Sequence, residues 1–362
     1  MLIRSLPQMK QPISRANPSL WMEDKFFPNP IIWNIKTDMA HELSPTTLKI
    51  LNILNDCEVH TGSDMAEYLG ISRTAVWKVI QRLKQYNCDI KSQHQGYVLG
   101  APLIPFDRNK IEDFIESSNV SLEIFESVSS TNDYLKNKVS LQNIQGCLAE
   151  YQSKGRGRMG RSWVSPFGRN IYCSLGYVLH KDISELSGLS LVVGILIARA
   201  LELLDQRIKP LLKWPNDIYL NNKKAGGILI DIIAEANGSC RVILGIGLNI
   251  NMKDIELEDV EKPWISLEDI LGVKLDRNLV VAQLINSIVK GMEDFVEKGI
   301  EPFLEQWKRY DLLENRHISL STGVETLSGM GKGISQQGYL LLELPSGEVR
   351  KISSGDTTLL KT

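Results

Sequence analysis

The chain has few of the residues that build disulfide frameworks or transition-metal centres. Its 362 residues include five cysteines and five histidines, and both are widely scattered. No two cysteines form a CxxC pair, so neither a disulfide framework nor a zinc site is indicated. We expect free thiols, a reducing cytoplasmic environment and no transition-metal site.

The chain also lacks a strong net charge, a membrane span and a signal peptide. Its formal net charge is -2, so any contact with nucleic acid must come from a local basic patch. The longest charge-free apolar run, residues 186–198, is shorter than the ~20 residues of a membrane span and predicts a buried core helix. The first 30 residues do not have a basic stretch followed by an apolar one, so we expect no export.

The length predicts two or three domains, since one domain takes about 150 residues. Residues 1–43 show no helical or alternating period and are expected to form a flexible extension. Two prolines in residues 101–106 indicate a linker. Residues 107–313 mix helical stretches with short strands, which predicts an α/β core. Short alternating runs separated by glycines predict a small β-barrel over residues 316–362.

Residues 44–100 have the pattern of a winged helix-turn-helix. Thr61 and Ser72 cap the second and third helices, Gly70 allows the turn between them, and the Gln95-Gly96 pair predicts the hairpin of a wing. The basic residues that follow Ser72 are expected near DNA phosphates; they are Arg73, Lys78, Arg82, Lys84 and Lys91. The side chains expected to face DNA bases are Arg73, Thr74, Trp77, Lys78 and Gln81. The alternative is a three-helix cap with a merely solvated basic face.

The sequence Gly155-Arg-Gly-Arg-Met-Gly-Arg161 formally matches a dinucleotide-binding GxGxxG motif. That motif requires a helix at its third glycine, and Pro166 and Gly168 prevent one here; the spacing of a P-loop is also missing. The loop instead offers several cations on a backbone softened by glycine, which suits a triphosphate or an acyl phosphate. A solvated basic hairpin is the alternative.

A second motif joins Lys213-Trp-Pro-Asn-Asp217 to Lys223-Lys-Ala-Gly-Gly-Ile-Leu-Ile-Asp231. The pair Asn221-Asn222 predicts a hairpin turn between two strands. Such a hairpin would bring Lys213, Asp217 and one lysine of the returning strand together, with room for a ligand beside the glycines.

Together with Ser130-Thr-Asn132, Gln152 and Gly245-Ile-Gly-Leu-Asn-Ile250, these motifs resemble, in the same order, those of the biotin–protein ligase family. The winged-helix start is similar to the bifunctional members that also repress the biotin operon. The resemblance implies a central domain with a mixed sheet like that of class II aminoacyl-tRNA synthetases and an SH3-like C-terminal barrel. It also implies the substrates biotin and ATP, with Mg²⁺, a biotin carboxyl carrier protein and operator DNA as partners, and a homodimer.

The resemblance also implies roles for individual residues. The catalytic residues would be Lys224, Arg158 and Asp217, and Asp217 would help to place Mg²⁺. Biotin would contact Ser130, Thr131, Asn132, Gln152, Arg156, Gly157, Arg158, Lys224 and Gly227. The nucleotide would contact Arg156, Arg158, Arg161, Lys213, Asn216 and Asn249. Trp163 and Trp264 are candidate pocket walls.

Two other functions remain open from the sequence. One is a biotin-sensing DNA-binding repressor that has lost turnover. The retained Lys224, Asp217 and the arginine loop, residues 155–161, argue against it. The other is a ligase for lipoate or a fatty acyl group. The chain departs from the family pattern in its first 43 residues and in the glycine at position 226, and its recognition helix does not reveal the operator.

Overall fold

The computed structural model describes residues 41–42, 44–136, 138, 143–235, 238–253 and 263–360. Nearly all of the predicted N-terminal extension therefore lies outside the described residues. Its two described residues form β1 (His41–Glu42), which pairs antiparallel with strand β4 (Val120–Val128).

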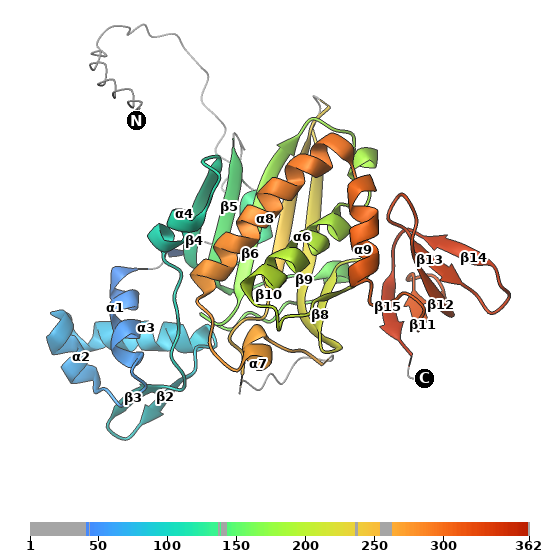
Figure 1. Cartoon of the computed structure of the whole chain (residues 1–362). Coiled ribbons are helices and arrows are strands. Elements are labelled where there is room, and N and C mark those ends of the chain that lie inside the picture. The colour runs from blue at the N-terminus through green and yellow to red at the C-terminus, as the bar shows by residue number, and fades with distance from the viewer. Residues whose placement is uncertain are drawn as a thin grey trace, which may run out of the picture. The chain divides into compact units, whose positions relative to one another are not determined.

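The predicted winged helix-turn-helix is present. It consists of α1 (Pro45–Leu54), α2 (Gly62–Leu69), α3 (Arg73–Gln85) and the hairpin of β2 (Ile90–Gln93) and β3 (Gly96–Leu99). The hydroxyls of Thr61 and Ser72 accept hydrogen bonds from the third backbone N–H that follows each, as N-caps do. Gly70 ends α2 in the left-handed conformation, with φ of 65°. Figure 1 shows these helices in blue and the hairpin in teal.

Two details of this domain differ from the sequence prediction. The hairpin turns at His94 and Gln95, while Gly96 is already the first residue of β3. Gly96 is needed for another reason, because a Cβ there would lie 2.2 Å from the carbonyl oxygen of His60. Arg82 was expected near DNA phosphates, but its Nε lies 2.6 Å from Oε1 of Glu126, a buried residue of β4. This end of α3 is therefore bound to the central domain.

The central domain is built on an eight-stranded mixed sheet with the order β1-β4-β5-β6-β10-β9-β8-β7. Strands β4 and β5 are parallel, and all the other neighbours are antiparallel, which confirms the mixed sheet. The strands after β4 are β5 (Ile144–Gln152), β6 (Ile171–Leu179), β7 (Leu211–Lys213), β8 (Asp217–Leu220), β9 (Lys223–Ala234) and β10 (Cys240–Leu248).

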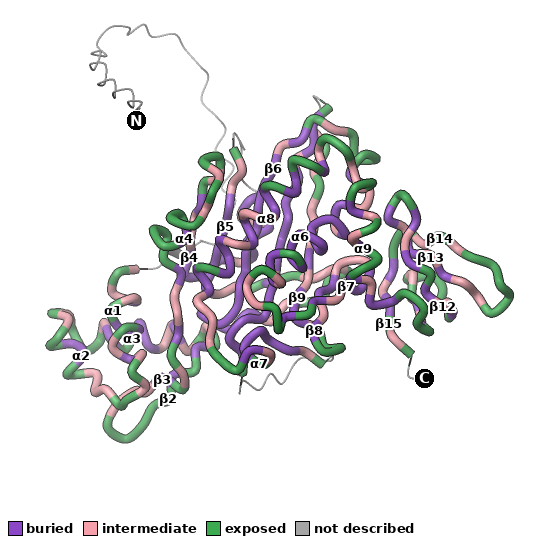
Figure 2. Tube along the Cα trace, in the orientation of Figure 1, coloured by how far each residue is buried: buried purple, intermediate pink, exposed green. Residues whose placement is uncertain are grey.

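Helices α6 (Leu189–Leu204) and α8 (Arg277–Lys298) cover one face of this sheet (Figure 1). The strands beneath them are buried (Figure 2). The helical stretch Ile183–Leu204 is long and apolar enough to span a membrane, yet 67% of its apolar window is buried inside the protein. The predicted core helix is thus confirmed. The shorter helices are α4 (Arg108–Phe114), α5 (Thr131–Lys136), α7 (Leu267–Leu271) and α9 (Leu304–Tyr310).

The C-terminal domain is a five-stranded antiparallel sheet with the order β14-β13-β12-β11-β15. Its strands are β11 (His317–Ser321), β12 (Thr326–Ile334), β13 (Leu340–Glu343), β14 (Val349–Ile352) and β15 (Asp356–Leu359). The alternating runs that predicted this domain are β11, β13 and β14. In β12 and β15, glycines and threonines obscure the apolar period.

The linker before α4 is held by a buried ion pair. The guanidinium of Arg277 donates to Glu150 Oε2 at 2.6 Å, and both side chains are fully buried. Arg277 also donates to the carbonyl of Ile104, and the backbone N–H of Phe106 donates to the other oxygen of Glu150. The predicted linker is therefore a fixed segment whose polar groups are paired in the core.

Candidate active site

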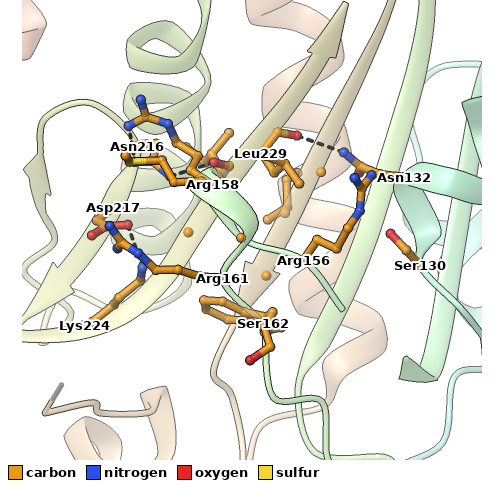
Figure 3. Close-up of a pocket in the computed structure, with 18 of the residues that line it drawn as sticks. Ser130, Asn132, Arg156, Arg158, Arg161, Ser162, Asn216, Asp217, Lys224 and Leu229 are labelled. Atoms are coloured by element: carbon orange, nitrogen blue, oxygen red, sulfur yellow. Dashed lines mark hydrogen bonds and ion pairs between the residues drawn. The ribbon is translucent and has the colours of Figure 1, made fainter. Parts of the chain in front are cut away.

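A cavity opens where α5, β5, the arginine loop and strands β8 to β10 meet. Figure 3 shows its polar side chains, which come from segments far apart in the sequence. All nine residues predicted to bind biotin line it, and so do all three predicted catalytic residues. The two motifs that the sequence placed in one site are thus brought together by the fold.

One end of the cavity is lined by hydroxyl and amide side chains and is rich in hydrogen bonds. The side-chain oxygen of Gln152 accepts from the backbone N–H of Thr131 at 3.0 Å and from its hydroxyl at 3.2 Å. Ser174 Oγ lies 2.7 Å from Thr131 Oγ1 and 2.6 Å from Asn132 Oδ1. Ser130, Thr131 and Asn132 are buried. These side chains are held in fixed orientations, which suits recognition of a polar, uncharged ring.

The side chain of Asn132 lies directly against the backbone of β10. A Cβ at Gly245 would lie 2.1 Å from Asn132 Oδ1, so only glycine allows this contact. The amide nitrogen of Asn132 donates to the carbonyl of Leu229 and to Asp231 Oδ2 on β9. The glycine at position 245 therefore leaves the space that Asn132 occupies, while a Cβ at Gly247 would meet the Trp163 ring at 2.6 Å.

The arginine loop forms a closed hairpin. The N–H of Gly157 donates to the carbonyl of Arg161 at 2.7 Å, and the N–H of Trp163 donates to the carbonyl of Gly155 at 2.8 Å. Met159, at the tip, has φ of 55°, a conformation that L side chains rarely adopt. Because the tip of the hairpin is tight, the arginine side chains on either side of it point in different directions.

Each arginine of this loop has its own partner. Arg156 pairs with Asp133 on α5 and lies 3.6 Å from Asp231. Arg158 donates to the side-chain oxygen of Asn216 at 3.2 Å. Burial lowers the pKa of Arg158, and the nearby carboxylates of Asp217 and Asp356 oppose this shift. The guanidinium remains a cation at neutral pH.

Lys224 lies at the end of the cavity where Arg158 and Arg161 also lie (Figure 3). Its Nζ is 2.7 Å from Asp217 Oδ1 and 5.6 Å from the centre of the Trp163 ring. The predicted turn brings it there, because Asn221 and Asn222 both have positive φ and Leu220 pairs with Lys223. Burial, and to a lesser extent the carboxylates of Asp217 and Asp356, raises the pKa of Tyr219 to about 12.

Two residues predicted to bind the nucleotide, Lys213 and Asn249, do not line the cavity. The ammonium of Lys213 is buried and donates to the carbonyl of Thr357 in the C-terminal domain at 2.7 Å. The side chain of Asn249 donates to the carbonyl of Ile265. Both side chains bind the protein's own backbone here.

Several cavity residues were missed by the sequence analysis. Ser174 does not line the cavity, but it hydrogen-bonds to Thr131 and Asn132, which do, and it was detectable as a lone hydroxyl in an apolar strand. Gly355 and Asp356 were not, because they follow the arginine loop by nearly 200 residues and belong to another domain. The remaining missed residues are Met159, Ser162, Ile228, Leu229, Gly245, Ile246 and Gly247. Trp163 does form a cavity wall, as expected.

The face of α3 that was predicted to contact DNA bases is largely exposed. Its exposed residues are Arg73, Thr74, Trp77 and Lys78, and Gln81 is half-buried, while the opposite face of α3 packs in the domain core.

All five cysteines are described, and all are free thiols. Within the described ranges, no three histidine, cysteine or acidic residues cluster as a metal site would need.

Comparison with known proteins places these features in context. Residues 124–249 match the biotin/lipoate A/B protein ligase family, residues 46–98 match an HTH domain, and residues 315–358 match the biotin protein ligase C-terminal domain. The chain is 36% identical to the bifunctional ligase/repressor BirA of Salmonella typhimurium over 86% of this chain and 97% of that protein. It is 31% identical to the protein of the same name from Bacillus subtilis, over 83% and 94% of the two chains.

A solved structure extends the likeness to three dimensions. The biotin protein ligase of Aquifex aeolicus in complex with biotin and ATP is 30% identical to this chain, with a TM-score of 0.57. The match covers 68% of this chain and 100% of that one.

Proposed function

Because the chain belongs to the biotin protein ligase family, we propose that it joins biotin to ATP as biotinyl-5'-AMP and then transfers biotin to a lysine of a carrier protein. The observation that carries this function is one cavity with two ends. An end lined by hydroxyl and amide side chains around Thr131 and Gln152 runs into a cationic end around Arg158 and Lys224.

The end lined by hydroxyl and amide side chains would hold the ureido ring of biotin. Ser130, Asn132 and Gln152 are fixed by hydrogen bonds within the protein before any ligand arrives. A ligand that left such buried polar groups unpaired would bind poorly, which gives specificity. Lipoate has no ureido group, so this end of the cavity favours biotin over the lipoate alternative.

In the first step, a carboxylate oxygen of biotin attacks the α-phosphorus of ATP. The bond from that phosphorus to the bridging oxygen of pyrophosphate breaks, and pyrophosphate leaves with the electron pair. Arg156, Arg158 and Lys224 would stabilise the negative charge that builds on the phosphate oxygens. Asp217 would hold Lys224 in place through the 2.7 Å ion pair.

In the second step, the neutral amine of the carrier lysine attacks the carbonyl carbon of the adenylate. An amide bond forms, AMP leaves with the electrons of the C–O bond, and the amine releases a proton. The hairpin from Gly155 to Trp163 would cover the adenylate and exclude water until the carrier arrives. We expect this carrier to be the biotin carboxyl carrier protein of acetyl-CoA carboxylase.

Mg²⁺ would enter as part of the ATP substrate. Mg²⁺ typically keeps several waters and binds substrate phosphates with one or two carboxylates. Asp217 is the carboxylate proposed for this role, and it already pairs with Lys224. The described residues near it do not form a cluster that would hold the ion alone.

The winged helix supplies the second function, repression of the biotin operon. The exposed face of α3 would enter the major groove, with Arg73 and Lys78 near phosphates or bases. A homodimer would present two such helices to a two-fold operator. In the described part of the sheet, the pairing of β9 with β8 ends at Gly227, so residues 229–234 of β9 have an edge that a second copy could use. Biotin transfer and operator binding would both take place in the cytoplasm.

Labelling of a purified biotin carrier domain tests the ligase function. Wild-type protein with biotin and ATP should add one biotin per carrier, and lipoate should neither be transferred nor compete at equal concentration. Tight biotin binding without labelling would contradict the ligase and leave a ligand-sensing repressor. Transfer of lipoate would instead support the broader acyl-ligase alternative.

A further inference from the structure

The C-terminal domain reaches into the cavity at one carboxylate. Asp356, the first residue of β15, lies with its Oδ2 2.6 Å from a terminal guanidinium nitrogen of Arg161. The carbonyl of the preceding Gly355 accepts from Arg158 at 3.4 Å. Both residues line the same cavity as Lys224 and Asp217. Two of the loop arginines therefore contact the C-terminal domain.

The backbone that carries Asp356 is anchored to the central domain. The buried ammonium of Lys213 donates to the carbonyl of Thr357, and the hydroxyl of Thr357 donates to the carbonyl of Trp214. The indole N–H of Trp214 donates to the carbonyl of Gly338, in the loop before β13. Trp214 and Thr357 are almost fully buried. These contacts fix the position of Asp356 relative to the site before any ligand binds.

Arg161 needs such a partner. Its side chain is 48% exposed, and it follows the glycine-rich tip of the loop. A free arginine side chain has many rotamers, and ordering it costs about 1.5–2 kcal/mol of conformational entropy. Asp356 engages one terminal nitrogen of a guanidinium that has five N–H donors in all, so most donors stay available for a phosphate.

We propose that Asp356 is a positioning residue for the ligase reaction: it holds Arg161 at the nucleotide end of the cavity, so that the C-terminal domain completes the ATP site. This inference rests on the proposed function. Arg161 exchanges part of its contact with Asp356 for the polyphosphate when ATP binds. The exposed ion pair is weak enough to allow this exchange, since such pairs contribute little net stability.

The test measures biotin-dependent exchange of pyrophosphate into ATP, which reports the first step without a carrier. Asp356→Asn keeps the size of the side chain and removes its charge. It should raise KM for ATP roughly 5- to 20-fold, because ATP must then order the free side chain of Arg161, with kcat and KM for biotin changed less than about twofold. Asp356→Glu should restore most of the ATP affinity. Glu325→Gln, in an exposed ion pair elsewhere in the C-terminal domain, should have no effect.

A double-mutant cycle separates positioning from a structural role. With Arg161→Ala as background, Asp356→Asn should add no further loss, because the two residues act as a unit. Equal rises of KM for ATP and for biotin, additive losses, or an unchanged or lower KM for ATP in Asp356→Asn would overturn the proposal. Absence of exchange in the wild type would instead overturn the ligase function, and this inference with it.

Discussion

The ammonium of Lys224 on β9 lies 2.7 Å from a carboxylate oxygen of Asp217 on β8, and the hairpin at Asn221 and Asn222 creates this contact. The pair joins the two halves of one motif across a tight turn. The carboxylate of Asp217 holds the ammonium of Lys224 in place at the cationic end of the cavity. We therefore expect the relative position of these two residues to set the rate of adenylate formation.

Replacement of Lys224 by alanine should lower kcat for adenylate formation by about 10²- to 10³-fold, the usual cost of losing one preorganised charge at a transition state. Biotin-dependent pyrophosphate exchange measures this rate. Lys223→Ala is the matched control, because Lys223 is the exposed neighbour on the same strand. Comparable losses in both variants would show that the position of Lys224 is not special.

Replacement of Gly245 by alanine should raise KM for biotin at least about tenfold and leave KM for ATP nearly unchanged. The new Cβ would meet Asn132 Oδ1 at 2.1 Å and push the amide out of its hydrogen bonds, and a displacement of about 1 Å at such a site can cost 10²-fold. In Gly194→Ala, the control in α6, the Cβ would meet no atom closer than 3.4 Å. A biotin KM unchanged in Gly245→Ala would contradict the role of Asn132.

The exposed face of α3 should determine DNA binding. Lys78→Ala should weaken binding to a random-sequence duplex and reduce the slope of log K against log salt by about 1, as expected for one lost phosphate contact. Fluorescence anisotropy at several salt concentrations measures both quantities. Lys110→Ala, at an exposed position of α4, should change neither. An unchanged slope for Lys78→Ala would favour the merely solvated basic face.

Replacement of Arg277 by alanine should lower the free energy of unfolding by about 3–5 kcal/mol, because Glu150 would remain buried without its cation. Denaturant unfolding followed by circular dichroism measures this loss. Arg108→Ala removes an exposed ion pair in the neighbouring helix and should change stability by less than about 0.5 kcal/mol. A small loss for Arg277→Ala would mean that Glu150 finds other partners in the core.

The sequence by itself determined the local structure and the chemistry of the main motifs. Caps at Thr61 and Ser72 and the glycine at position 70 fixed the helix-turn-helix, since capping and left-handed turns depend on a few adjacent residues. The turn at Asn221 and Asn222 was predicted for the same reason, although the turn alone left open which lysine of the returning strand meets Asp217. The cationic loop was recognisable from its residues, while its union with Ser130, Thr131, Asn132 and Gln152 in one site came from the resemblance to the biotin–protein ligase family.

Only the tertiary structure decided which charged side chains pair with groups of the protein itself instead of facing a ligand. Arg82 and Lys213 look like ligand-binding cations in the sequence, but one pairs with Glu126 of the central sheet and the other donates to Thr357 of the C-terminal domain. Asp356 gave no signal, because its partner Arg161 lies 195 residues earlier in the chain. A charged side chain has the same appearance in a sequence whether it is solvated or paired, and burial and partner are set by contacts between distant segments.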